Sequence, residues 1–120
     1  HVRVVAARFL ELRDEAFTGG FVVRRFENFD SDEVRTWWVN GRCALVTSHP
    51  DTPDTRTGTV HTGHIAAAIN QLDCPFVTVD LARRRDGEWR IIEVGDAQVS
   101  DRPSSVPPAQ LLEFLANPPA

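Results

Sequence analysis

The sequence contains no lysine, no methionine and no tyrosine, and only two of its 120 residues are cysteine. All 13 basic side chains are therefore arginine, so the chain offers no lysine as a nucleophile, a Schiff base or a phosphate ligand. Cys43 and Cys74 are too few for a disulfide framework. No run approaches the ~18 apolar residues of a membrane span, and we expect no membrane partner.

The missing methionine also bears on how much of a protein this chain represents. Because the chain starts at His1, we expect it to be a fragment, or the ordered part of a longer protein. Arginine, alanine, aspartate and proline stand in place of lysine, isoleucine and asparagine, a usage that suggests a GC-rich bacterial source. We expect a bacterial protein of the cytoplasm.

The residues that are present describe an ordinary globular domain. Apolar residues make up 42% of the sequence and charged residues 25%, a mixture that can build a core. A length of 120 residues fits a single domain, which we place at 1–120. The net charge of −4 argues against a general nucleic-acid binder, which usually shows a basic face.

Hydrophobic spacing predicts the order of the elements. Helical spacing covers three segments, 2–15, 60–72 and 108–115. Strand-like composition covers five segments, 21–26, 33–39, 42–48, 75–83 and 88–95. We therefore predict an α+β fold, an antiparallel sheet of about five strands with helices packed on one face. Residues 49–59 are expected to form an exposed loop, either a lid or a disordered segment.

Two dipeptides predict hairpin turns and so set the register of the strands. A two-residue turn at Asn40-Gly41 pairs Glu33 with Ser48, Arg35 with Val46, and Trp37 with Ala44. A two-residue turn at Asp86-Gly87 pairs Leu81 with Ile92, and Asp80 with Glu93. The second hairpin therefore places two carboxylates directly opposite each other.

This opposed pair of acids is the most informative feature of the sequence. Opposed carboxylates repel each other, and burial would force one of them to take up a proton. A cation between Asp80 and Glu93 would keep the pair, and hard oxygen ligands select Mg²⁺ or Mn²⁺. Asp96, just past the strand end, is placed to add a third carboxylate. The spacing therefore indicates a metal site of Asp80, Glu93 and Asp96.

Other interpretations of the same residues stay open at this point. Asp80 and Glu93 can lie on a solvated sheet face, or be neutralised by Arg83 or Arg90. A three-residue turn would shift the pairing and separate the two acids. Binding of Ca²⁺ for stability alone is a further interpretation of the acidic set.

Several stretches of the sequence resemble a known fold. The run 93–100, Glu-Val-Gly-Asp-Ala-Gln-Val-Ser, is similar to the last strand of ATP-grasp proteins that read Glu-Val-Gly-Asp followed by Gln-Val-Ser. Residues 21–26 resemble the strand that leads into the hinge between the two ATP-grasp subdomains. Residues 33–42 resemble the Glu-x-Arg hairpin after that hinge. The resemblance extends from about Phe9 to Leu115 and implies the C-terminal subdomain of the ATP-grasp fold.

The resemblance implies a nucleotide site on this chain, with ATP and Mg²⁺ (or Mn²⁺) as cofactors. Glu33 matches the acid that holds the ribose hydroxyls. Arg35 matches a basic residue directed at the phosphates or the acyl intermediate, and is the candidate catalytic residue. Arg25 and Phe26 lie where the fold borders the adenine.

The resemblance also implies a metal site at the end of the chain. Asp80 and Glu93 match the Mg²⁺-binding acids, in agreement with the opposed-pair argument. Many ATP-grasp enzymes have asparagine two residues after the metal-binding glutamate, where this sequence has Gly95. The asparagine role therefore passes, at most, to Asp96.

ATP-grasp enzymes use ATP to turn a carboxylate into an acylphosphate, which an amine or thiol then attacks. The resemblance implies a parent protein that is an ATP-dependent carboxylate–amine ligase. Its partners would be a nucleotide, a small carboxylate and the remainder of the ATP-grasp fold. That remainder would supply the lysines that hold the α- and β-phosphates, so we expect this fragment alone to be inactive. The alternative is a non-catalytic α+β binding module with a degenerate or lost ATP site.

Overall fold

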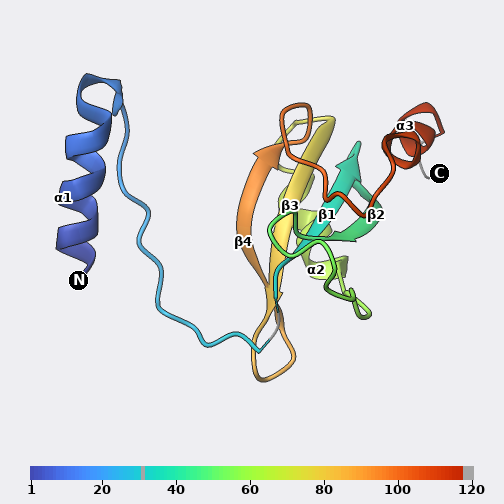
Figure 1. The fold of residues 1–120 in the computed structure, drawn as a ribbon, viewed down its shortest axis with the longest axis horizontal. Coiled ribbons are helices and arrows are strands. Elements are labelled where there is room, and N and C mark those ends of the chain that lie inside the picture. Colours follow the sequence, from blue (N-terminus) through green and yellow to red (C-terminus); the bar gives the residue numbers. More distant parts are fainter. Residues whose placement is uncertain (31, 118–120) are drawn as a thin grey trace.

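The computed structural model describes residues 1–30 and 32–117. Its centre is a four-stranded antiparallel sheet with the strand order β2-β1-β3-β4 (Figure 1). The strands are β1 (Val34–Val39), β2 (Arg42–Ser48), β3 (Phe76–Arg83) and β4 (Trp89–Asp96). They are rich in β-branched and aromatic residues, which suit a pleated, half-buried surface. The four strands predicted from residue 33 onward are confirmed.

The helices are α1 (Val2–Arg13), α2 (Gly63–Ile69) and α3 (Pro108–Ala116), and a short 3₁₀ turn, Asp14–Ala16, follows α1. The predicted α+β class is confirmed. Among these helices, only α2 buries residues, and α1 stands apart from the sheet (Figure 1). The helix predicted over 60–72 is shorter at both ends, and the chain leaves it through Asp73, whose φ is 48°.

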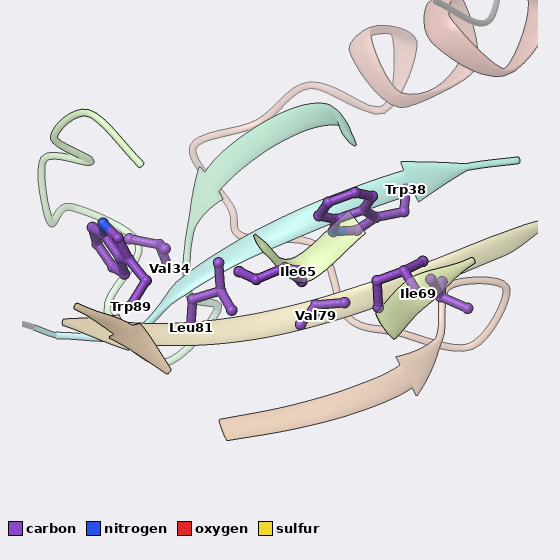
Figure 2. Close-up of a cluster of buried hydrophobic side chains, with 8 residues drawn as sticks. Val34, Trp38, Ile65, Ile69, Val79, Leu81 and Trp89 are labelled. Carbon is purple, nitrogen blue, oxygen red and sulfur yellow. The ribbon is translucent and has the colours of Figure 1, made fainter. Parts of the chain in front are cut away.

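The core lies on one face of the sheet. Eight buried side chains form it: Val34, Trp38, Ile65, Ile69, Val77, Val79, Leu81 and Trp89. Figure 2 shows Ile65 of α2 lying over the strands of the sheet. Because side chains alternate along a strand, Arg35, Trp37 and Asp80 belong to the opposite face, which we call the site face.

The first hairpin keeps its predicted turn but not its whole predicted register. Asn40 and Gly41 both have positive φ, 48° and 76°, as a type I′ turn requires. The pairs next to the turn, Val39 with Arg42 and Trp38 with Cys43, have the predicted register. An irregularity between Trp37 and Trp38 then shifts the pairing by one residue. The structure pairs Val34 with Ser48, Arg35 with Thr47, and Trp37 with Leu45, so the three predicted pairs are wrong.

The second hairpin departs from prediction twice, and the two departures cancel at the acidic pair. Arg84 N–H bonds to the Glu88 carbonyl at 2.8 Å, so the loop is three residues rather than two. Leu81 consequently faces Ile91, and the predicted partner Ile92 is wrong. A bulge between Asp80 and Leu81 restores the predicted register, and Asp80 faces Glu93 as expected.

The strand predicted over 21–26 is wrong. The segment lies outside the sheet and has no strand pairing. Its composition favours a strand, but a strand forms only where a neighbouring backbone supplies hydrogen bonds. The segment is held instead by the Arg24 side chain, which donates to the carbonyls of Ile91 and Ile92 at 2.6 and 3.0 Å. The sheet therefore has four strands, not about five.

Candidate functional site

An ion pair occupies the middle of the site face. Arg35 in β1 and Asp80 in β3 are register partners across the sheet. Arg35 donates through Nε to Asp80 Oδ1 and through Nη2 to Oδ2, both at 2.7 Å. The Arg35 and Asp80 side chains are only 10% and 3% exposed. This planar, two-bond pairing is the strongest form of an arginine–carboxylate contact.

Arg35 is also fixed from the far side of the molecule. Its Nη1 donates to the carbonyl of Asp101, in the loop between β4 and α3, at 2.7 Å. The hydrogen bonds to Asp80 raise the pKa of Arg35 above its ordinary value, while burial opposes that shift. Arg35 is therefore a permanent, oriented cation on this face.

The structure adds His49, a residue that the sequence-based reasoning missed. Its Nε2 lies 3.5 Å from Asp80 Oδ2 and 3.4 Å from Arg35 Nη2. Its Nδ1 accepts the Asp51 backbone N–H at 3.2 Å, which leaves the proton of the neutral ring on Nε2, toward Asp80. The available signal was position, because His49 follows Ser48, the partner of Val34, and so comes beside Glu33.

An acidic cavity of about 500 Å³ opens beside this pair. It is lined by Asp32, Glu33, His49, Asp51, Thr52, Ile92 and Glu93. Four of these side chains are carboxylates and none is lysine or arginine, so the lining favours a cation. Glu33, His49 and Asp80 each bring one potential metal-ligand atom within 4.8 Å of the others. In this arrangement, however, Asp80 already has Arg35 as its counter-ion.

The predicted metal ligands are only partly brought together. Glu93 stands opposite Asp80 and lines the acidic cavity. Asp96 pairs with Val77, a core residue, and so belongs to the other face of the sheet. The Asp96 carboxylate accepts the Gln98 backbone N–H at 2.9 Å. Asp80 and Glu93 thus share the site face, and Asp96 does not join them.

Gly95 occupies the position at which many ATP-grasp enzymes have asparagine, and here it is crowded. A Cβ at Gly95 would lie 3.0 Å from the Thr78 Oγ1 and 3.2 Å from the Ser100 Oγ. These two hydroxyls bond to each other at 2.7 Å. A hydroxyl pair therefore fills the space beside Glu93 on the site face.

The predicted adenine-binding residues line a second cavity of about 500 Å³. Arg25 and Phe26 both border it, and Phe26 is 84% exposed. Ile92 lines this cavity and the acidic cavity alike, so the two are adjacent. The structure therefore places Arg25, Phe26 and Glu33 along one continuous surface, with Arg35 and Asp80 at its inner end.

Taken together, an antiparallel α+β sheet with paired acids, an oriented arginine and an aromatic-bordered cavity defines a nucleotide-binding class of domain. Comparison with protein families gives the particular one. Residues 1–115 match a family described as an ATP-grasp domain, the third family of its clade. The chain belongs to this family, and the ATP-grasp resemblance seen in the sequence is confirmed. No curated protein and no solved structure matches the chain significantly.

Family membership settles the broad class of function. An ATP-grasp domain binds a nucleotide, and its fold includes a partner domain. None of the helices in the described part of the chain is long and apolar enough to cross a membrane.

Proposed function

We propose that this chain carries the Mg²⁺- and ATP-binding part of an ATP-dependent carboxylate–amine ligase that works through an acylphosphate. The observation that supports this most directly is the register of Asp80 and Glu93 beside the fixed cation Arg35. Two carboxylates and an arginine on one face match the needs of phosphoryl transfer, which depends on positioning and charge neutralisation.

The donors at Asp80 and Glu93 fit a hard divalent cation. Each carboxylate oxygen carries two lone pairs, so the bonds from Arg35 leave acceptor capacity on Asp80. Glu93 has no hydrogen bond or ion pair with another described residue and is free to act as a ligand. Mg²⁺, or Mn²⁺, would neutralise phosphate charge here while keeping positions for water and substrate oxygens.

Arg35 is the residue to which we assign the catalytic role. Three of its five N–H groups hold Asp80 and the Asp101 carbonyl, and the other two, on Nη1 and Nη2, are not used by these bonds. A guanidinium held so firmly can donate to phosphoryl oxygens without first losing side-chain freedom. Glu33 at the cavity wall would accept the ribose hydroxyls, while Arg25 and Phe26 would border the adenine.

The partner domain of the fold would complete this site. The chain has no lysine with which to hold the α- and β-phosphates. The helix α1 has no buried residue, although it carries several valines, leucines and a phenylalanine. We therefore propose that residues 1–120 form the C-terminal part of the fold, and that the other part supplies lysines and covers α1.

Calorimetric titration tests this proposal. The full-length protein containing this chain is titrated with a non-hydrolysable ATP analogue, with Mg²⁺ and after removal of metal by EDTA. Binding that needs Mg²⁺ should fall at least about tenfold in the Asp80→Asn/Glu93→Gln variant. The matched control, Asp54→Asn/Glu113→Gln, changes two exposed acids outside the site and should leave binding unchanged.

One observation favours a second candidate, a non-catalytic binding module. Asp80 is already neutralised by Arg35, so the pair can be structural rather than metal-binding. Absence of nucleotide binding by the wild-type protein at millimolar concentration would support that candidate. So would undiminished binding in the Asp80→Asn/Glu93→Gln variant.

A further inference from the structure

A third cavity lies on the site face, where the chain between β4 and α3 crosses the sheet (Figure 1). It is a groove of about 500 Å³ between the ends of β1 and β3 and the helix α3. No role was predicted for it from the sequence. Its two ends differ in chemistry, and this difference indicates what it can bind.

The floor and one wall of the groove are apolar. The rings of Trp37 and Phe76 form the floor, with centroids 6.1 Å apart. The Trp37 indole N–H is already bonded to Thr47, so its ring offers only an apolar surface. Leucines of α3 form the wall, and Leu112 and Leu115 are 64% and 40% exposed. Exposed leucines facing an aromatic floor favour an apolar ligand.

The other end of the groove carries a cation. Arg102 lines the groove and is half-buried. Its one hydrogen bond to a described residue goes from Nη1 to the neighbouring Pro103 carbonyl at 3.2 Å, and none of the described acids pairs with it. Arg35, by contrast, already has Asp80 as its counter-ion. A half-buried guanidinium without a counter-ion is stabilised strongly by a ligand carboxylate.

Chain connectivity ties this cation to the proposed ATP site. Arg102 follows Asp101, whose carbonyl accepts a hydrogen bond from Arg35. Trp37 lies two residues beyond Arg35 along the same face of β1, a separation of about 7 Å. The charged end of the groove therefore borders the residues that would handle phosphate.

We propose that this groove binds a monocarboxylate with an apolar tail, and that this acid is the substrate activated by the ligase. Leucines of α3 and the two aromatic rings take the tail, and Arg102 takes the carboxylate. The assignment as a substrate rests on the proposed function, whereas the binding itself does not. The charge of Arg102 selects a small acid as the occupant over a second copy of the chain.

Binding is tested without nucleotide, by calorimetric titration of the chain with octanoate and with octanamide. Octanoate should bind about tenfold more tightly than the amide, because only the acid forms a charge-assisted pair. Arg102→Gln should remove that difference, while Arg42→Gln, an exposed arginine outside the groove, should preserve it. Leu112→Glu, at an exposed position, should abolish binding of both ligands.

Three results would overturn the groove proposal. These are equal affinity for the acid and the amide, an effect of Arg42→Gln equal to that of Arg102→Gln, and a dimer in sedimentation that Leu112→Glu dissociates. Octanoate binding in a protein that fails to bind Mg²⁺ and ATP would leave the groove assigned and would remove only its role in ligation. Loss of octanoate binding with intact nucleotide binding would do the reverse.

Discussion

At the scale of single residues, the pair Arg35–Asp80 shows how a charge survives in the middle of a sheet. Asp80 is almost fully buried between apolar residues of β3. Taking a carboxylate out of water is costly, and two hydrogen bonds from a guanidinium recover that cost. The carbonyl of Asp101 satisfies a further donor of Arg35. The pair is therefore both a structural element and the centre of the candidate site.

Removing the cation alone should destabilise the protein strongly. In Arg35→Met, Asp80 keeps its buried charge without a partner, and the free energy of unfolding should fall by about 3–5 kcal/mol. Urea unfolding followed by tryptophan fluorescence measures the change. The control Arg42→Met, at an exposed arginine of β2, should change stability by less than about 0.5 kcal/mol. A loss below about 1 kcal/mol for Arg35→Met would show that the ion pair contributes little to stability.

At the scale of elements, the two hairpins separate what a turn dipeptide determines from what it does not. Both turn regions form where Asn40-Gly41 and Asp86-Gly87 predicted them. Loop length and bulges then decide which residues face each other. Neither bulge has a dipeptide signal, because each arises from packing of the strand against its neighbours. The pairing of Asp80 with Glu93 was predicted correctly although the intervening loop was not.

The two turn glycines offer a matched measurement of this geometry. Gly41 and Gly87 both have positive φ, 76° and 92°, so alanine at either costs about 1 kcal/mol in backbone strain. A Cβ at Gly41 would also lie 1.7 Å from the Asn70 side-chain oxygen, whereas nothing lies within 4 Å of a Cβ at Gly87. Gly41→Ala should therefore destabilise more than Gly87→Ala in thermal unfolding.

The cause of that excess can be checked with Asn70, which follows α2. In an Asn70→Ala background, Gly41→Ala should cost no more than Gly87→Ala, since the crowding atom is gone. An equal cost for both glycines in the wild-type background would mean that Asn70 rotates away freely.

At the scale of the whole molecule, the chain divides into a packed sheet and an N-terminal arm, which we define as residues 1–28. The sheet carries every residue of the core cluster apart from the two isoleucines of α2. In the arm, α1 has no buried residue, and only a small cluster of rings, Phe9, Phe17 and Phe21, packs locally. A 12-residue helix without tertiary packing is marginal in water. This arrangement fits an arm that packs against the partner domain.

Hydrogen exchange measures this division directly. Amides of α1 in the isolated chain should exchange nearly as fast as in an unfolded peptide, while those of β1 and β3 should exchange slowest. In the full-length protein, contact with the partner domain should slow exchange in α1. Equal protection of α1 and the sheet in the isolated chain would contradict the division.

The sequence by itself determined the α+β class, the places of the four paired strands, the turns and the ATP-grasp family, because these depend on local composition and on short motifs. It also placed Asp80 opposite Glu93. Only the tertiary structure decided that Arg35 pairs with Asp80, that His49 joins them, and that Asp96 lies on the other face. These contacts join residues distant in the chain, and one shift in register changes which of them meet. For the same reason, composition alone could not show that residues 21–26 lack a partner strand, since pairing depends on a neighbour and not on the segment itself.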